Sequence, residues 1–291
     1  MAGTAGGGRP AEVGVAQPAV RVEPLGPATL TDMLDGGWRL LHDQPGTVLA
    51  LSAMFLVPSA VLAGAGTAAL DEDVSTVVLG VPLLEESDSF PWEAMLASVG
   101  SSALRALGVL FLGVALTYVV TARQSGARLG AVPAAGLALR RSGAVLGAWP
   151  LLAAGSVIAY VACVLPLGVW LAFTAVVAPA IAAEGVGPIA AIGRSFTLVA
   201  RRFWMALGVV LLSTLVATLL TWVLTAIPNA LSSELPWASR WAVDTVTGLL
   251  AALLTVGPLV TSCVLLYLDL RVRTEGLDLR QRASVAFHRA G

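Results

Sequence analysis

The segment EGVGPIAAIGRSFTLVARRFW, Glu184–Trp204, separates two long apolar runs and carries the charge that both runs lack. On a helix, its large apolar residues recur at steps of three and four and form one stripe: Ile189, Ile192, Phe196, Val199 and Phe203. Its three arginines lie off that stripe: Arg194, Arg201 and Arg202. This pattern predicts a short amphipathic helix that lies on a membrane surface and leads directly into a spanning helix.

The composition of the whole chain is typical of a protein that crosses a membrane several times. Hydrophobic residues make up 57% of its 291 residues and charged residues only 12%, whereas soluble domains carry about one quarter charged residues. All of the basic residues are arginine, which indicates the GC-rich coding of a bacterium. The two cysteines, Cys163 and Cys263, lie inside apolar runs and are interpreted as small buried hydrophobic residues.

Apolar runs long enough to span a bilayer, about 20 residues each, recur along the chain. The uncharged run 142–183 is too long for one crossing, so we expect two helices with a tight turn near Leu165-Pro166. Arg105 falls in the first turn of its span, from which it can reach the membrane surface. The predicted fold is an all-α polytopic integral membrane protein with six transmembrane helices and two or three cytoplasmic interfacial amphipathic helices. The six spans are about 47–66, 103–122, 145–164, 167–184, 204–226 and 245–268.

Charge placement predicts the orientation of these helices. All arginines except Arg105 and Arg240 lie in the termini or in the loops 123–141 and 184–202. Because arginine-rich loops stay in the cytoplasm, both termini are expected there, in a bacterial plasma membrane, with the acidic loop 71–100 outside. The predicted domains are a disordered cytoplasmic tail over 1–27, a six-helix membrane domain over 28–270 and a cytoplasmic C-terminal tail over 271–291.

A weak internal repeat accompanies the short helices. The segment Leu34–Leu41, in a helix that Thr31 is expected to cap, aligns with Ile192–Val199, and a span follows each of them. A third, fainter copy aligns Arg141–Leu146 with Arg194–Val199. The hypothesis is a unit of one cytoplasmic helix and a two-helix hairpin, used three times in the same orientation.

The C-terminal motif YLDLRVRTEGLDL, Tyr267–Leu279, resembles the end of a group of bacterial multi-pass membrane proteins. These proteins contain the membrane domain of glycerophosphoryl diester phosphodiesterase. Two further segments are similar to that group: Leu30–Leu41, and the stretch from Pro179 to Trp204. The resemblance implies a six-helix membrane module of unassigned biochemical role, and it marks pattern positions that we interpret as structural. These positions are Asp35, Trp38, Pro179, Glu184, Pro188, Arg194, Ser195, Tyr267, Asp269, Arg271, Arg273, Glu275, Gly276 and Asp278.

The resemblance covers the membrane part of that group and does not extend to catalysis. The phosphodiesterase chemistry resides in a separate soluble barrel domain with paired histidines and metal-binding carboxylates. This chain has only His42 and His288, on a juxtamembrane helix and near the C-terminus. Its sequence has no phosphate-binding loop, nucleophile elbow or zinc motif, so we expect neither enzymatic activity nor a cofactor or metal.

Two functions are expected from these features. The leading hypothesis is a non-catalytic module that scaffolds or anchors partners in the bacterial cell envelope, because polar residues gather at the cytoplasmic face and no span has an ionisable residue near its middle. The alternative is a transporter or lipid-handling protein, which the threefold repeat would suit, as would Pro58, Pro179 and Pro258 as breaks in spanning helices. A polar cavity among the helices would favour this alternative. The expected partners are the lipid bilayer and proteins at the cytoplasmic face, and not nucleic acid.

Overall fold

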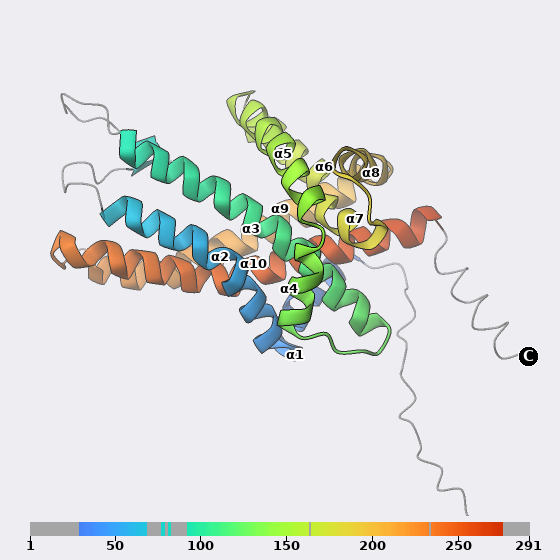
Figure 1. Cartoon of the computed structure of the whole chain (residues 1–291), viewed down its shortest axis with the longest axis horizontal. Coiled ribbons are helices and arrows are strands. Elements are labelled where there is room, and N and C mark those ends of the chain that lie inside the picture. The colour runs from blue at the N-terminus through green and yellow to red at the C-terminus, as the bar shows by residue number, and fades with distance from the viewer. Residues whose placement is uncertain are drawn as a thin grey trace, which may run out of the picture.

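A computed structural model of the chain describes residues 29–68, 77–78, 81–82, 92–162, 164–232 and 234–275, and these residues are almost entirely helical (Figure 1). Two strands of two residues each, β1 and β2, pair antiparallel: Val77–Val78 and Val81–Pro82. The helices are α1 (Leu30–Asp43), α2 (Pro45–Ala68), α3 (Trp92–Gln124), α4 (Ala131–Leu139), α5 (Ser142–Ala162), α6 (Val164–Thr174), α7 (Val177–Glu184), α8 (Pro188–Ala200), α9 (Phe203–Ser232) and α10 (Trp237–Glu275).

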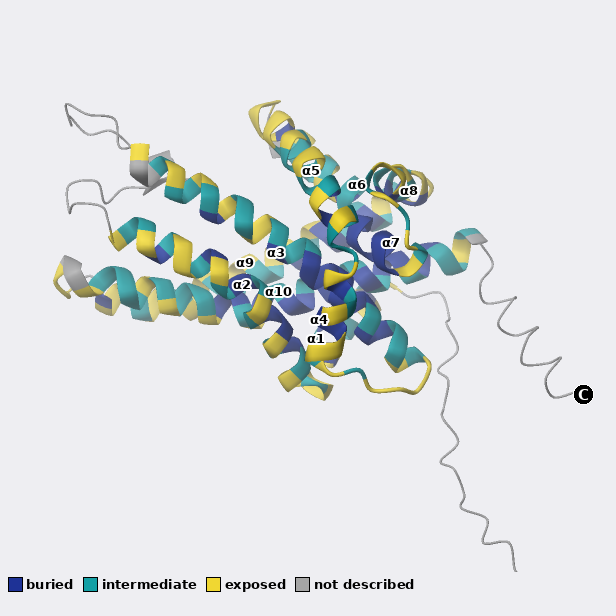
Figure 2. Ribbon diagram, in the orientation of Figure 1, coloured by how far each residue is buried: buried dark blue, intermediate teal, exposed yellow. Residues whose placement is uncertain are grey.

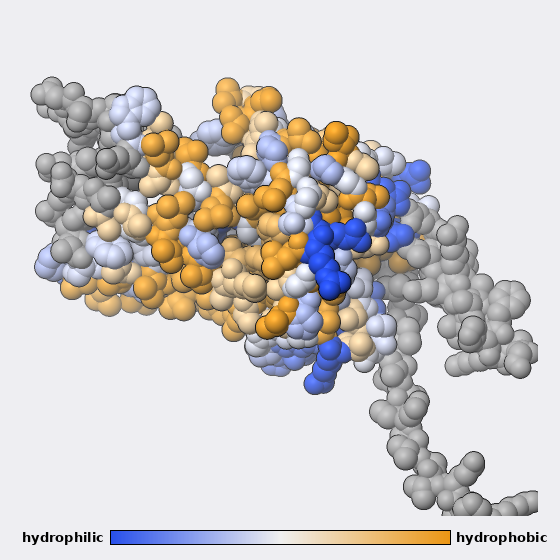
Figure 3. All heavy atoms as spheres, in the orientation of Figure 1, coloured by the Kyte–Doolittle hydropathy of each residue, from blue (hydrophilic) through white to orange (hydrophobic). Residues whose placement is uncertain are grey.

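Six helical segments of the described residues are long and apolar enough to cross a membrane: α2, α3, α5, α6 with α7, α9 and α10. Large hydrophobic side chains on their outer faces are exposed, as on α5 and α9, where Val161 and Trp222 are 81% and 74% exposed. Lipid chains would cover such faces in a bilayer. Figure 3 shows these hydrophobic residues over the spanning helices, with the strongly hydrophilic ones gathered near α4 and α8. The prediction of an all-α polytopic membrane protein with six spanning helices is confirmed.

Several element boundaries differ from those expected. Helix α5 ends at Ala162 and α6 begins at Val164, just before Leu165, and the fourth span is broken at Ala175–Val176 into α6 and α7. The helix α3 begins at Trp92 and its candidate span at Met95, so the expectation that Arg105 lies in the first turn is wrong, because the helix continues through the residues before it. The last helix reaches Glu275 and so includes residues that were expected to belong to the tail. The tail predicted over 1–27 lies outside the described residues.

A three-part order runs through the helices, since a short helix precedes each pair of spanning segments. The three units are α1–α2–α3, α4–α5–α6/α7 and α8–α9–α10. Turns of one or two residues join the short helix to the first span: Gln44, Arg140–Arg141 and Arg201–Arg202. The fourth residue after each turn is fully buried: Val48, Val145 and Ala206. The register expected for the faint third copy is wrong, because Arg141–Leu146 leads into the spanning helix α5 and the short helix of that unit is α4.

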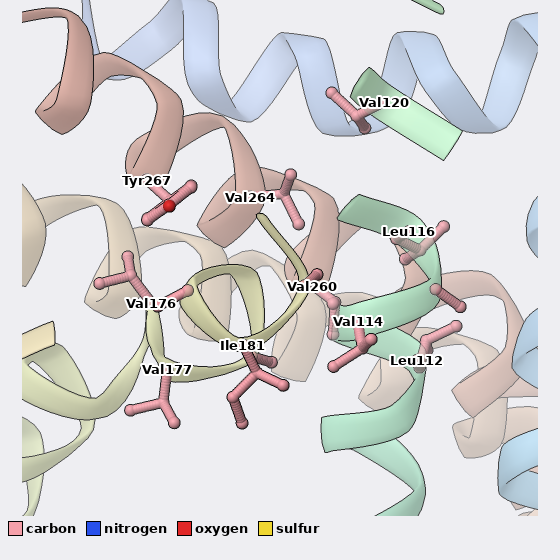
Figure 4. Close-up of a cluster of buried hydrophobic side chains, with 14 of the residues drawn as sticks. Leu112, Val114, Leu116, Val120, Val176, Val177, Ile181, Val260, Val264 and Tyr267 are labelled. Atoms are coloured by element: carbon pink, nitrogen blue, oxygen red, sulfur yellow. The ribbon is translucent and has the colours of Figure 1, made fainter. Parts of the chain in front are cut away.

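The units pack around one centre. Their last segments α3, α7 and α10 contact one another, whereas the first spans α2, α5 and α9 lie further out and are less buried (Figure 2). Each short helix packs on the last spanning segment of the preceding unit: α4 on α3, α8 on α7, and α1 on α10, which closes the ring. Figure 4 shows the side chains of the buried cluster at this centre, among them Leu116 from α3, Ile181 from α7 and Val264 from α10.

The helix α1 is held at both ends. Thr29, rather than the expected Thr31, caps it: the Thr29 hydroxyl accepts from the Asp32 amide at 3.3 Å, and the Asp32 carboxylate accepts from the Thr29 amide at 2.8 Å. The Thr29 hydroxyl also donates to the Asp32 carboxylate at 2.6 Å, and this bond, followed by the one from the Thr29 amide, lowers the pKa of Asp32. A hydrogen bond from Arg123 lowers the pKa of Asp43 at the other end. Both carboxylates therefore favour the fold when they are ionised, and this contribution disappears as the pH falls below their usual pKa.

Substitutions at the adjacent glycines Gly36 and Gly37 test how closely α1 approaches α10. A Cβ at Gly37 would lie 2.5 Å from the backbone oxygen of Pro258, whereas a Cβ at Gly36 would meet only the end of the Leu265 side chain, which can rotate away. Gly37→Ala should therefore destabilise the protein by about 1–3 kcal/mol through overpacking, and Gly36→Ala should be neutral or slightly stabilising because alanine favours a helix. Thermal unfolding in detergent, followed by tryptophan fluorescence, measures both. Equal midpoints for the two variants would contradict this packing.

Candidate functional site

The first candidate site lies where α7 ends and α8 begins. α7 ends at Glu184, and Gly185 follows in the left-handed conformation with φ of 65°, which lets the chain reverse at once. Pro188 then takes the first position of α8, where its missing amide hydrogen costs nothing. This reversal brings Arg194 over Glu184, and the Arg194 Nε lies 3.0 and 3.1 Å from the two carboxylate oxygens.

The helix α10 completes this cluster. The Tyr267 hydroxyl donates to Glu184 Oε1 at 2.9 Å, and the Arg271 Nε lies 3.8 Å from the same oxygen. The Arg271 guanidinium also sits over the Tyr267 ring, 5.6 Å from its centroid. Because the Glu184 side chain is only 18% exposed, these partners stabilise its charge where water reaches it poorly. The cluster joins α7, α8 and α10 through one carboxylate.

Two further bonds extend the cluster. Asp269, buried on α10, accepts from Arg273 Nε at 2.9 Å with both oxygens, which secures the last turns of that helix. Ser195 of α8 donates to the Phe173 carbonyl at 2.5 Å. That carbonyl belongs to the last turn of α6, where the helix break leaves backbone oxygens without helical partners. Ser195 on α8 therefore supplies a hydrogen bond to a carbonyl at the break in the fourth span.

The structure thus brings together most of the residues marked by the sequence, with exceptions. Pro179 is buried in α7 beside the cluster. Asp35 pairs with Arg39 at 2.7 Å on the exposed face of α1, and Trp38 borders a small hollow against α9 and α10. The side chain of Glu275, together with Gly276 and Asp278, lies outside the described residues. The charged marked residues at the meeting of α7, α8 and α10, called the Glu184 joint below, are bonded to one another.

The second candidate site is a partly open cavity of about 670 Å³ at the opposite end of the bundle. Its walls come from α2, α3 and α10, with one residue from α9. Pockets of about 300–1,000 Å³ are usual for small-molecule ligands. The lining is mostly small and apolar with polar groups spread along it: Leu56, Ser59, Ala60, Ala63, Thr67, Ser101, Ser102, Arg105, Thr221, Arg240, Trp241, Asp244, Thr245, Gly248, Leu249 and Ala252.

Charged residues occupy two depths of this cavity. At the mouth, Arg240 donates to the backbone oxygens of Ser232 and Leu235 at 3.3 and 3.2 Å, and Asp244 accepts from the Ser232 hydroxyl at 2.7 Å. Both therefore hold the turn between α9 and α10. Arg105 lies deeper in the bundle. Ala97 of α3 lies beside Gly66, near the end of α2, and Arg105 is about 12 Å further along α3, towards the middle of the bundle.

Arg105 differs from the other arginines of the spanning helices. Within the ranges that the structure describes, no hydrogen bond or ion pair is formed by Arg105, and the residue is exposed towards the cavity. An ionisable side chain inside a spanning helix is costly and usually functional. The cavity was not expected from the sequence, because Arg105 was placed at a helix end. Ser101 lies one turn before Arg105, and the two residues form a polar face on an otherwise apolar helix, which could have indicated the cavity.

Comparisons of this chain with family models, with curated proteins and with solved structures gave no match. The family resemblance of the sequence therefore stays a prediction. The site is interpreted from its own geometry, within the class that the fold defines, a helical multi-pass membrane protein.

Replacing Glu184 tests the joint. Glu184→Gln keeps the shape but removes the charge that Arg194, Tyr267 and Arg271 share, so we expect a loss of about 2 kcal/mol in unfolding free energy. The matched control is Asp35→Asn, whose pair with Arg39 is 57% and 73% exposed and should cost less than about 0.5 kcal/mol. Thermal midpoints in detergent compare the two. A Glu184→Gln midpoint equal to that of Asp35→Asn would show that the joint contributes nothing to stability.

Proposed function

We propose that the chain belongs to a bacterial plasma membrane with both termini in the cytoplasm. The support is the arginine distribution, because the short helices and their turns carry half of the described arginines, and the strongly hydrophilic residues near α4 and α8 lie at one end of the bundle (Figure 3). In this orientation the Glu184 joint faces the cytoplasm. The cavity then opens in the outer half of the bilayer.

Reporter fusions test this orientation. Green fluorescent protein at the C-terminus should fluoresce, because it folds in the cytoplasm, and alkaline phosphatase at the same position should be inactive. Alkaline phosphatase inserted after Leu79 should be active, because that loop is placed outside. Active phosphatase at the C-terminus would reverse the proposed orientation.

The function we propose is the binding and handling of a lipid or another amphiphile, without catalysis. The proposal is based on the cavity and on the change from charged to apolar lining residues along its length. From Arg240 to Ala252 the α10 wall extends about 18 Å, which is close to the depth of one leaflet, about 15 Å. Its mouth is charged and its inner end, at Leu56 and Ala252, is apolar. An amphiphile in the leaflet has the same order of polarity and could enter without turning over.

A scaffold for cytoplasmic partners is the second candidate. The observation that favours it is the exposure of Arg140, Arg201 and Arg202 on the turns after two short helices, where an acidic partner could bind. The charged residues of the Glu184 joint are bonded to one another and support this role less. The resemblance to phosphodiesterase membrane domains, itself a proposal, agrees with either function.

A cavity-filling variant tests the lipid-handling proposal. A Cβ at Gly248 would meet no atom within 4 Å, so Gly248→Phe should place its ring in the cavity without strain. Gly143→Phe is the matched control, since Gly143 on α5 is equally open and lies outside the cavity. The wild type and Gly143→Phe should retain lipid through detergent washing, counted by native mass spectrometry, and Gly248→Phe should lose at least one bound lipid. Identical lipid counts in all three proteins would refute the proposal.

A further inference from the structure

We infer that Arg105 is the recognition residue of the cavity and that it binds the singly charged anionic head of a single-chain amphiphile. The inference rests on the proposed function, because it names the class of molecule that the cavity takes. It depends on three features: the balance of charge in the cavity, the direction in which Arg105 extends, and the shape of the space around it.

The charge balance makes Arg105 the source of the net charge in the cavity. Arg240 and Asp244 have opposite charges, lie four residues apart on α10 and hold the same turn through Ser232. Their fields therefore largely cancel over the distance to Arg105. The remaining positive charge lies among apolar helices, where the low dielectric strengthens its attraction for an anion. One uncompensated positive charge matches a head with one negative charge, so the expected head carries one.

The hydroxyl groups near Arg105 leave its charge uncompensated. Ser59 donates to the Leu56 carbonyl at 2.7 Å and Ser101 donates to the Ser98 carbonyl at 3.0 Å, so each hydroxyl is bonded to its own helix. Neither group carries charge, and a neutral oxygen accepts from a guanidinium far more weakly than a carboxylate or a phosphodiester does. An anionic head can therefore supply the negative charge that these neighbouring groups do not supply to Arg105.

The direction of the helix places the guanidinium in the middle of the cavity. Side chains on a helix lean towards its N-terminus, and the N-terminus of α3 is at the mouth of the cavity. The guanidinium therefore extends from the depth of Ser59 towards the mouth, as arginines in spanning helices generally do. Below it the walls are apolar, with Leu56, Leu249 and Ala252. This leaves an anion-binding position directly above the apolar inner end of the cavity.

The shape and volume favour one chain. Small residues line the walls on both sides, Ala60 and Ala63 on α2 and Gly248 on α10, which makes a narrow slot along the helices. A volume of about 670 Å³ is in the range of pockets that enclose one drug-sized molecule, less than a lipid with two chains requires. A free inorganic anion would leave the apolar part of the slot without an occupant.

Binding of a charged and an uncharged probe to the protein in detergent, counted by native mass spectrometry, provides the measurement. The probes are stearate, at a pH where it is ionised, and its methyl ester, which has the same chain and no charge. Wild-type protein should bind the acid at a lower concentration than the ester. Arg105→Gln should raise the concentration of acid that half-occupies the protein about tenfold and leave that of the ester unchanged.

Controls separate recognition from folding. Arg105→Lys keeps the charge and should keep the preference for the acid. Arg128→Gln, which replaces an exposed arginine in the loop after α3, should behave as wild type. If Arg105→Gln does not fold, the acid-over-ester preference of the wild type and of Arg105→Lys decides. No such preference, or an equal effect of Arg105→Gln on both probes, would overturn the inference. Displacement of the acid by millimolar inorganic phosphate would overturn the amphiphile in favour of a free anion.

The outcomes also distinguish this inference from the proposed function. If Gly248→Phe loses its lipid while Arg105→Gln binds the acid as wild type does, the cavity takes a lipid whose head Arg105 does not recognise. If neither variant changes binding, both the proposed function and the inference fail.

Discussion

The three central helices meet at one close contact, and the rest of the structure depends on it. A Cβ at Gly113 of α3 would lie 2.8 Å from the Ala178 Cβ of α7 and 3.6 Å from a Val260 methyl of α10, so only a glycine allows these backbones to approach. Inside a bilayer the hydrophobic effect does not drive helices together, and close contact of small residues has to supply the attraction. The buried cluster in Figure 4 surrounds this point, with Val114 on one side and Val177 on the other. The core therefore lies in the half of the bundle that contains α7.

That location explains the cavity in the other half. α7 packs against α3 and α10, whereas α6, which continues the same span, packs mainly against α5, α8 and α9. Aromatic contacts hold α6 in this outer position: the Phe173 ring stacks on Phe196 and on Phe203, with centroids 4.8 and 5.4 Å apart. Ser195 satisfies the carbonyl that the break exposes. Because α6 does not continue along the centre, the space beside α3 and α10 is left for the cavity.

The sequence predicted those features that depend on local composition. Apolar runs of sufficient length gave the six spans, and arginine placement separated the two ends of the bundle, because both are properties of single segments. The marked residues Glu184, Arg194 and Tyr267 meet in one cluster, although a resemblance and not their spacing selected them. The break at Ala175–Val176 could not be predicted, since neither residue disfavours a helix and contacts from other helices decide it. The depth of Arg105 was missed for a related reason: α3 begins well before its apolar run, and hydropathy alone does not show where a long helix starts.

The three-part order of the chain relates the broken fourth span to the cavity. Three similar units packed in a ring would give three equivalent inner helices and a filled centre along the whole bundle. The second unit departs from this arrangement, because its inner span is broken and only α7 reaches the centre. The joint around Glu184 fixes α7 against α10 and α8, so contacts within the fold hold this departure in place. A cavity lined by the first and third units follows at the other end, and Arg105 enters it from α3, the helix that the missing segment would otherwise cover. The buried core thus lies in the half where the three units agree, and the cavity lies in the half where they differ.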